Sequence, residues 1–540
     1  MTVTTSSRIP RLPFAATLPA LVRWATHDFG ERDFIVTDTE RMTFAETDAY
    51  SRRLAAELLA DGIGKGTRVA LHFPYGPDWV VAFLAVTRIG ALAMPVSTAY
   101  KPPELAKVLR IGDVHTLLAP RRMFGRDEAA LLEEAVPGIS DRPPLRLASH
   151  PYLRSIRLLD SARSPHGAVV SDELLDAVES EVTPADLGVV IFTSGTTSAP
   201  KGVMHTHGAL VRHTAQLAAM LGVTGADRIY CGMPFFWIGG LGYTLLPALH
   251  AGATILCLER FEAGAALELM ERERATRITG WSNVIRAVLT HPSRRQRDLS
   301  SIPILSGESV GNAHDPRANV LGMTETIGPH MLFDARQPLP DLTDDLFGSN
   351  GYPVPYVEHR VVDPVTAEPV SDGTEGELCL RGYNLMAGLY KREREEVFDA
   401  DGWYRTGDHG TFRSGLFFFT GRRDTLIKTA GNNVAPLEVE LAMLALPEVK
   451  ETFVLGVPDP EREQVVAAVV VPVPGALVEP NELRDRLHKQ LSAYKVPRHI
   501  LVLDAESVPR LGMGKPDLLA LQTLLAANWP ATNGTTPETE

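Results

Sequence analysis

The sequence predicts an α/β protein with a large N-terminal domain of several subdomains, made of parallel sheets with helices plus a β-rich part, and a small α+β C-terminal domain. Through the first four hundred residues, short continuous apolar runs alternate with helical patterns, as is typical of parallel sheets covered by helices on both faces. From about Gly348 the pattern changes to strands separated by turn residues, and the stretch after Asp424 has enough apolar content for its own core. A length of 540 residues fits this division.

The predicted elements follow in order along the chain. In the N-terminal domain we expect helices over 45–60, 78–89 and 102–111, with strands near 69–73, 91–95, 116–119, 189–192 and 253–258. The β-rich part is expected to contain strands over 361–363, 376–380 and 415–420. In the small domain we expect helices over 437–445 and 480–492, with strands over 452–456, 465–472 and 499–502. The domains are therefore placed at 1–423 and 424–528, before a disordered tail at 529–540.

Composition and charge exclude several classes of protein. A formal net charge of -13 makes a general nucleic-acid-binding surface a poor fit. Three widely separated cysteines exclude a disulfide scaffold and a cysteine zinc site, and they suit a reducing cytoplasm. The N-terminus lacks the apolar region of a signal peptide, and the most apolar stretch, 79–96, contains Arg88. We therefore expect a soluble, cytoplasmic protein without a membrane span.

The most informative loop lies at 191–202, between the strand at 189–192 and a helix expected over 209–221. Its sequence is Ile-Phe-Thr-Ser-Gly-Thr-Thr-Ser-Ala-Pro-Lys-Gly. Backbone N–H groups, hydroxyls and one cation are the donors that phosphate oxygens need. It is not a Walker A loop, because Lys201 precedes the second glycine and no Gly-Lys-Ser/Thr follows. The composition also fits a polar linker, so the order of residues carries the phosphate prediction.

Further motifs follow this loop, and their order indicates a family. They are Leu-Gly-Met-Thr-Glu at 321–325, Tyr-Arg-Thr-Gly-Asp at 404–408, Gly-Arg-Arg-Asp at 421–424, Gly-Asn-Asn-Val-Ala-Pro at 431–436 and Gly-Met-Gly-Lys at 512–515. Over about 30–520 the chain resembles the adenylate-forming (ANL) superfamily, in its acyl-CoA synthetase branch. The resemblance implies that a carboxylate attacks the α-phosphate of ATP to give an acyl adenylate and pyrophosphate, and that a thiol then attacks the adenylate. It also implies a mobile C-terminal lid.

The resemblance implies phosphate, metal and catalytic residues. The β- and γ-phosphates are expected on Thr193, Ser194, Gly195, Thr196, Thr197 and Lys201. Thr324 is expected to contact the α-phosphate and Glu325 to hold Mg²⁺, a hard cation that prefers oxygen ligands. Lys515 matches the lysine that bridges the carboxylate and the α-phosphate, where a cation stabilises growing charge. Taken alone, Thr324 and Glu325 would read as a helix start, and Lys515 as an exposed lysine after a turn.

The remaining nucleotide contacts and the lid elements also come from the resemblance. Asp408 is similar to the family's ribose ligand, Arg422 to the arginine that assists it and Lys428 to a lysine near the adenylate, although an isolated Asp–Arg pair is more often a surface ion pair. Asp424 matches the hinge, and Gly431 fits the close approach of the pantetheine arm of CoA. The adenine is expected against Gly307, Glu308, Ser309, Leu321, Gly322 and Met323.

This sequence departs from the family pattern around the adenine. Glu308 stands within a triplet that is small in many relatives, and Leu321 replaces an aromatic residue, so that stacking becomes apolar contact. The segment 307–321 is also shorter than in relatives that place a helix there.

An aromatic motif marks the expected acid pocket. We expect the pocket to be lined by Phe235, Phe236, Trp237, Gly239, Trp281, Ser282, Asn283 and His330. Trp237 stands where CoA-thioester-forming relatives often have histidine, and for Phe235 and Phe236 a place in the core is an equal alternative. Ile238 replaces the aspartate that binds the amine in amino-acid-activating members, so a free amino acid would bury an unpaired ammonium. An aryl, cyclic or medium-length acid with a polar feature fits better.

Three functions stay open at this level. The first is an acyl-CoA ligase that uses ATP, Mg²⁺ and CoA, with fatty acid metabolism as the expected area. The second is an adenylating ligase that hands the acyl group to a carrier-protein thiol or an amine. The third is a catalytically inactive nucleotide-binding protein, against which Lys201, Glu325, Asp408, Arg422 and Lys515 argue together. A homodimer is also considered, and nucleic acid is not an expected partner.

Overall fold

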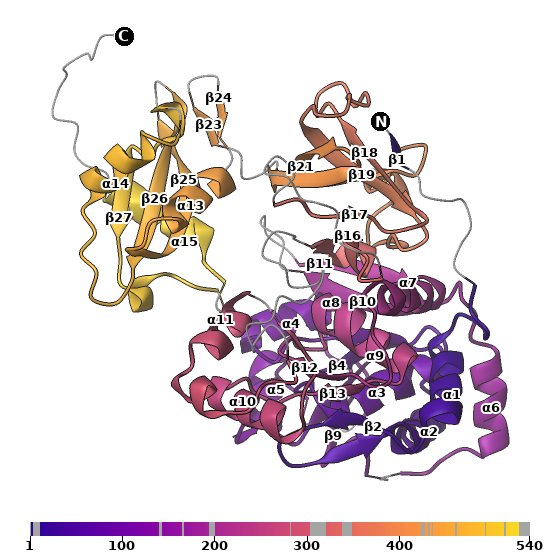
Figure 1. Cartoon of the computed structure of the whole chain (residues 1–540). Helices are drawn as coiled ribbons and strands as arrows, with labels where there is room; N and C mark the ends of the chain where they lie inside the picture. The colour runs from indigo at the N-terminus through magenta and orange to yellow at the C-terminus, as the bar shows by residue number, and fades with distance from the viewer. Residues whose placement is uncertain are drawn as a thin grey trace.

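The structure is a computed structural model. It describes residues 2–3, 11–139, 143–164, 167–193, 200–280, 282–302, 320–336, 348–422, 427–429, 432–434, 436–459, 462–491, 493–511 and 515–528. Figure 1 shows a large body of two stacked parts, with a smaller α+β lobe beside it in yellow. This arrangement confirms the predicted fold class.

The first α/β sheet is built from the predicted alternation of strands and helices. Its order is β20-β11-β10-β5-β4-β6-β9, and the strands from β10 to β9 are parallel. The strands are β4 (Arg68–Leu71), β5 (Leu92–Pro95), β6 (Thr116–Pro120), β9 (Ser155–Leu159), β10 (Leu187–Thr193), β11 (Lys201–Thr206) and β20 (Gly388–Leu389). Every residue of β5 and β6 is buried, because helices cover both faces of the sheet.

A second sheet packs on the same core. Its order is β14-β12-β13-β2-β3, with only β2 and β3 antiparallel. The strands are β2 (Asp33–Val36), β3 (Arg41–Thr43), β12 (Arg228–Cys231), β13 (Thr254–Leu256) and β14 (Arg277–Thr279). One apolar cluster joins both sheets to the helices α1 (Leu18–Phe29), α2 (Phe44–Ala60), α3 (Pro77–Arg88), α7 (His207–Met220) and α9 (Leu246–Ala251).

Shorter helices complete this part of the chain. They are α4 (Pro102–Ile111), α5 (Glu128–Ala135), α6 (Asp172–Ser180), α8 (Ile238–Gly240), α10 (Ala263–Arg272) and α11 (Ser282–Thr290). Helix starts follow local chemistry: Thr43 caps α2 in a reciprocal capping box with Glu46, and Thr206 caps α7 by accepting from the Ala209 N–H.

The β-rich part lies above the first sheet in Figure 1. Its five-stranded sheet runs β1-β18-β19-β21-β22, with neighbouring strands antiparallel, and a small sheet runs β15-β16-β17. The strands are β1 (Thr2–Val3), β15 (Leu321–Met323), β16 (Gly328–Leu332), β17 (Tyr352–Pro353), β18 (Val357–Val362), β19 (Gly376–Gly382), β21 (Tyr404–Arg413) and β22 (Leu416–Arg422).

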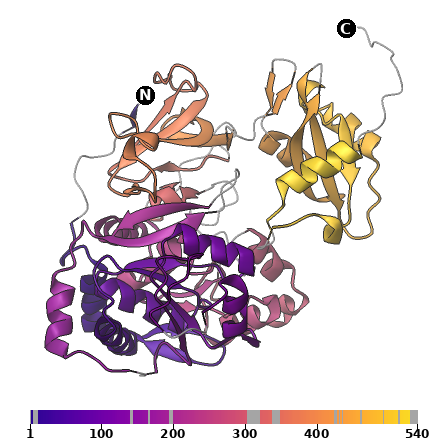
Figure 2. The same ribbon diagram turned by 180° about the vertical axis from the view of Figure 1, so that it is seen from behind.

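The small lobe has two cores, one on each side of its sheet. In the sheet β24-β23-β26-β25, β27 also pairs with β26. Val466, Ala468 and Val470 of β26 pack with α13 and α14 on one face, whereas the alternate positions 465, 467, 469 and 471 pack with α15 on the other. Figure 2 shows α15 crossing this second face. The elements are β23 (Ile427–Thr429), β24 (Asn432–Val434), α13 (Pro436–Leu444), β25 (Val449–Asp459), β26 (Glu463–Pro472), α14 (Pro480–Leu487), β27 (His499–Val502) and α15 (Leu518–Ala527).

Two predicted elements differ from the structure. Helix α14 ends at Leu487 rather than near 492. More importantly, β11 stands between the phosphate loop and helix α7, so the loop connects two antiparallel strands rather than a strand and a helix. Gly202 permits this close pairing, because a Cβ there would lie 2.9 Å from Val190 Cγ1 and 3.0 Å from Tyr390 Cβ.

The apolar stretch 79–96 forms α3 and β5, as expected. In the described part of the chain, no helix is long and apolar enough to cross a membrane. Arg88 lies at the end of α3 with its side chain 1% exposed, and its guanidinium bonds Glu179 at 2.8 Å, Ser51 at 3.1 Å and Asp48. This buried ionic cluster ties α2, α3 and α6 together.

Replacing Arg88 by Met should destabilise the protein by about 3 kcal/mol or more, because Glu179 and Asp48 would lose their buried cation. The exposed ion pair between Arg392 and Glu396 offers the control, since Arg392→Met should change the free energy of unfolding by at most about 0.5 kcal/mol. Urea unfolding of both variants measures the difference. Equal effects would contradict a structural role for the Arg88 cluster.

Candidate active site

The hairpin of β10 and β11 carries the ends of the phosphate loop. Thr193 and Lys201 are cross-strand partners at the end of the hairpin where the loop leaves and returns, and there Thr193 is half-buried and Lys201 is exposed. The exposed lysine and the threonine hydroxyl therefore stand side by side on one rigid element. On the other side of β11, β20 pairs through Leu389 with Val203.

A short 3₁₀ turn, Thr324–Thr326, joins β15 to β16 and carries two of the predicted site residues. The Thr324 carbonyl accepts a hydrogen bond from His205 Nε2 on β11 at 2.7 Å. The Glu325 carbonyl accepts from the Met386 N–H at 2.8 Å, and the Thr326 carbonyl accepts from Asn384 Nδ2 at 3.2 Å. The backbone of the turn is thus fixed from two directions, while the side chains of Thr324 and Glu325 remain half-buried.

The turn closes on an unusual backbone conformation at Ile327. This fully buried, β-branched residue has a φ of 62°, in the left-handed region. Such a conformation costs on the order of 1–3 kcal/mol and persists only where the surroundings enforce it. Thr326 Oγ1 supports it by donating to the carbonyls of Met323 and Gly328.

The Glu325 carboxylate is oriented by a tyrosine from the neighbouring sheet. Tyr404 Oη donates to Glu325 Oε1 at 3.3 Å. Tyr404 begins β21, the strand that also carries Asp408.

Asp408 and Arg422 are cross-strand partners on β21 and β22. Asp408 is only 2% exposed, and its N–H donates to Thr406 Oγ1 at 3.0 Å. Gly407 has a φ of 74° and donates its N–H to Glu377 Oε1 at 3.2 Å. These two bonds fix the backbone around Asp408 within the long strand β21.

The aromatic motif lies just before a helix of three consecutive segments: α8, a π-helical segment Leu241–Leu245 and α9. We call these the 238–251 helix. The ring of Trp237 is half-buried and meets Phe236 edge to face at 5.2 Å. Gly239 is also half-buried, so the motif offers partly accessible positions at the helix start.

Three predicted pocket residues lie in the interior, and one of them, Phe236, is 4% exposed. Phe235 is 0% exposed and packs against the rings of Tyr75 and Trp79, each at 5.7 Å. His330 is also 0% exposed, and its Nδ1 lies 3.1 Å from His359 Nε2. All three side chains are packed among other residues in this structure, and their place in the acid pocket stays a prediction.

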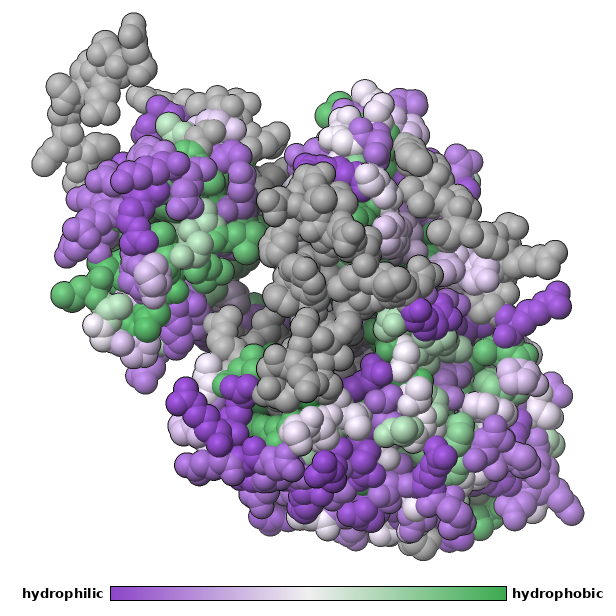
Figure 3. Space-filling view, in the orientation of Figure 1, coloured by the Kyte–Doolittle hydropathy of each residue, from purple (hydrophilic) through white to green (hydrophobic). Residues whose placement is uncertain are grey.

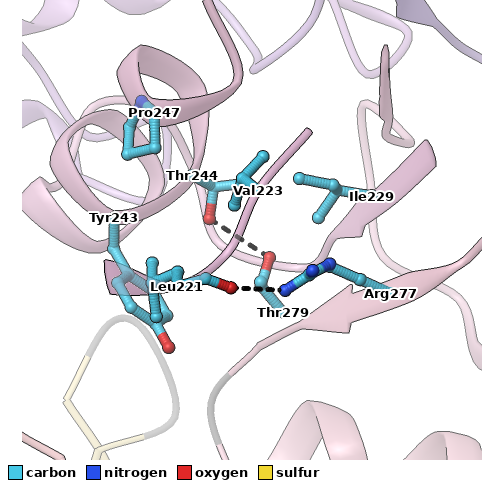
Figure 4. Close-up of a pocket in the computed structure, with 8 residues that line it drawn as sticks. All are labelled: Leu221, Val223, Ile229, Tyr243, Thr244, Pro247, Arg277 and Thr279. Carbon is cyan, nitrogen blue, oxygen red and sulfur yellow. Dashed lines mark hydrogen bonds between the residues drawn. The ribbon is translucent and has the colours of Figure 1, made fainter. Parts of the chain in front are cut away.

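A small cavity lies beside the π-helical segment (Figure 4). Its volume is about 30 Å³, which is room for water but not for an aromatic acid. Thr244 and Thr279 share a hydrogen bond of 3.1 Å on its wall, and Arg277 donates to the Leu221 carbonyl at 2.8 Å. This cavity is therefore not the acid pocket.

The remaining predicted residues lie in the small lobe, in β15 or outside the described residues. Lys515 is exposed in the small lobe, where its carbonyl accepts from the Leu511 N–H at 2.8 Å. Leu321, Gly322 and Met323 form β15, so this part of the expected adenine contact lies directly before the 324–326 turn. Outside the described residues are Ser194, Gly195, Thr196, Thr197, Trp281, Gly307, Glu308, Ser309, Asp424 and Gly431, together with the side chains of Ser282, Asn283, Arg422 and Lys428.

His205 and Tyr404 support the site and are not among the residues predicted from the sequence. His205 lies four positions after Lys201 on β11, and an alternation of side chains along a strand could have suggested that both share a face. Tyr404 stands inside a motif that was singled out only for Asp408.

The hairpin, the 324–326 turn and the Asp408–Arg422 pair, combined with a separate small lobe, define an enzyme of the adenylate-forming class. The chain matches the family described as AMP-binding enzyme over residues 22–390 and its C-terminal domain over 438–515. It belongs to this family, in the acyl-CoA synthetase branch, which confirms the predicted family.

Named relatives and solved structures extend this match over nearly the whole chain. A putative acyl-CoA synthetase, YngI, from Bacillus subtilis is 28% identical over 93% of this chain and 95% of its own length. Feruloyl-CoA synthase from an Amycolatopsis species is 30% identical over 88% of this chain and 92% of its own. The structure of the anthranilate CoA ligase AuaEII with anthranoyl-AMP superposes with a TM-score of 0.79 at 21% identity, covering 96% of this chain and 99% of that one.

Buried histidines make the site region sensitive to acid. Desolvation lowers the pKa of His205, His213 and His359 to about 4. Their neutral rings are hydrogen-bonded between β11, α7, β16 and β18, as in the 2.9 Å bond from His213 Nε2 to the Pro329 carbonyl. The folded state therefore disfavours their protonation relative to the unfolded chain.

We expect stability to be maximal above about pH 6.5, the unfolded pKa of histidine, and to fall as the pH drops toward 4, where the folded rings protonate. Each of the three histidines contributes a slope of up to about 1.4 kcal/mol per pH unit in this window. Urea unfolding between pH 7.5 and 4.5 measures the slope. His213→Gln removes one titrating ring and should reduce the slope by up to about 1.4 kcal/mol per pH unit. An unchanged slope in that variant would contradict the assignment.

Proposed function

We propose that this protein is an AMP-forming acyl-CoA ligase that activates an aryl or cyclic carboxylic acid with a polar substituent. It uses ATP and CoA, with Mg²⁺ held by Glu325. The observation that carries the proposal is the fixed 324–326 turn, which presents Thr324 and Glu325 close to the hairpin with Lys201 through the His205 hydrogen bond.

The charges that develop on ATP explain the residue types. Attack of a carboxylate oxygen on the α-phosphorus forms the P–O bond of the adenylate and releases pyrophosphate, so negative charge grows on phosphate oxygens. Lys201 and the Thr193 hydroxyl would hold the leaving phosphates, and Thr324 would donate to the α-phosphate. Asp408, supported by Arg422, would accept from the ribose hydroxyls.

Glu325 fits a magnesium role chemically. Mg²⁺ binds through one or two carboxylates and completes its shell with water and phosphate oxygens. A lone half-buried carboxylate suffices for that, and no larger cluster of metal-ligating side chains occurs among the described residues. When bound, the ion would neutralise phosphate charge.

The small lobe would complete the site. Lys515 would bridge the acid and the α-phosphate during adenylation, and the lobe from 424 to 528 would then turn about Asp424 so that Gly431 lines the thiol path. Figure 3 shows apolar residues on the visible face of this lobe, and its exposed leucines include Leu441 at 59% and Leu519 at 74%. A surface of this kind suits a lobe that meets the large domain in more than one way.

The acid class rests on the pocket and on the relatives. Trp237 offers a half-buried aromatic ring at the start of the 238–251 helix, and no acidic side chain lies between Cys231 and Gly242 to pair with an ammonium. Feruloyl-CoA synthase and the anthranilate ligase act on aromatic acids by name. A second candidate keeps the adenylation but passes the acyl group to a carrier-protein thiol or an amine; the tryptophan at 237 favours it.

Incubating the protein with ATP, Mg²⁺ and a panel of aromatic, cyclic and aliphatic acids, with and without CoA, tests the proposal by mass spectrometry. We expect an acyl-CoA product with at least one aromatic or cyclic acid. Acyl-AMP without a thioester for any acid would favour the second candidate, and nucleotide hydrolysis independent of acid would contradict both.

Lys515→Ala should lower the rate of acid-dependent pyrophosphate–ATP exchange by about 10²–10³, because one preorganised contact to the transition state is lost. Lys489→Ala, in the same lobe and outside every motif, is the matched control and should keep the exchange rate. Since the folding of the lobe does not depend on an exposed side chain, both variants should unfold at the temperature of the parent. Equal exchange rates in the two variants would remove Lys515 from the adenylation step.

A further inference from the structure

The 238–251 helix and the 324–326 turn touch through their backbones at one point. Gly242 lies in the π-helical segment, and a Cβ at this position would lie 2.7 Å from the Ile327 carbonyl oxygen and 3.1 Å from Ile327 Cγ2. Real Cβ atoms do not approach a carbonyl so closely, so only glycine permits the contact. The next residue of the turn, Gly328, extends this contact, because a Cβ placed there would lie 4.0 Å from Tyr243 Cβ.

Neither partner has freedom to yield. Ile327 is 0% exposed with a φ of 62°, and its N–H donates to the Thr324 carbonyl at 3.2 Å. The same carbonyl receives the His205 hydrogen bond, and Thr326 clamps the carbonyls on both sides of Ile327. On the helix side, π-helical segments often occur at functional sites, and this one follows Trp237 and α8 directly.

We propose that Gly242 is a positioning residue that couples the acid-side helix to the turn carrying Thr324 and Glu325. The contact fixes how far the start of the 238–251 helix stands from these two side chains, and hence the distance between a bound acid and the α-phosphate. The inference rests on the proposed function, because it assigns the turn to the nucleotide and the aromatic motif to the acid.

The alternative is that Gly242 serves packing alone. In that case a larger residue would lower the stability of the domain but would leave the rate of each folded enzyme molecule unchanged. A positioning role predicts instead that the rate of each folded enzyme molecule falls, since a displacement of about 1 Å at reacting groups can cost about a hundredfold in rate. The two readings therefore separate when rates are counted per active site.

Gly242→Ala tests the proposal in a single-turnover assay of adenylate formation, with active sites titrated by the pyrophosphate burst. We expect the rate per site to fall about tenfold to a hundredfold. The KM for ATP should change less than about threefold, because the hairpin with Thr193 and Lys201 does not touch Gly242. Gly208→Ala is the matched control: its Cβ would lie 2.8 Å from the Pro184 carbonyl oxygen, in another part of the same domain. It should lower the melting temperature without lowering the rate per site.

A double-mutant cycle with Ile327→Gly supplies an independent measurement. Glycine adopts the backbone conformation of residue 327 without strain and removes Cγ2, so the turn becomes freer to move. If both substitutions act on the same contact, their effects are not independent. The rate of the double variant should then be at least about fivefold higher than the rate expected from multiplying the two single effects. Multiplicative losses, or an unchanged rate per site in Gly242→Ala, would overturn the inference. A parent enzyme that forms no adenylate with any acid would instead contradict the proposed function.

Discussion

The candidate site depends on one constraint, the hydrogen bonding of every carbonyl in a three-residue turn. Successive carbonyls from Met323 to Thr326 accept from Thr326, His205, Met386 and Asn384, which come from three different parts of the chain. A backbone whose successive carbonyls are all paired cannot shift without breaking these bonds. The strain at Ile327 is tolerated for this reason, and two short side chains are held at a junction of three sheets.

The surrounding architecture serves this junction. Strand β11 reaches it from the first α/β sheet and presents Lys201 and His205, while β21 reaches it from the β-rich sheet and presents Tyr404 and Asp408. The link between these parts is made by β20, which pairs with β11 although almost two hundred residues separate them in sequence. Antiparallel addition of this short strand thus joins two parts of the large domain by backbone hydrogen bonds.

Much of this architecture could be predicted from sequence, because it depends on local patterns. The apolar runs of β5 and β6 identify strands buried on both faces, and Thr43 with Glu46 marks the start of α2. Strand β11 could not be predicted, because apolar and polar residues alternate too weakly over 201–206 to distinguish a strand from a loop. The burial of Phe235 and His330 depends on partners such as Trp79 and His359, which are distant in sequence and set by tertiary packing.

The alternate residues of β26 belong to two separate apolar cores, and this has a mechanical consequence for the small lobe. Because each face of its sheet is already covered by its own helices, the lobe acquires its folding free energy without the large domain. The turn of the lobe proposed above would then break surface contacts rather than a core. A ligand that prefers one orientation by about 1–3 kcal/mol would therefore shift the population of lobes toward that orientation.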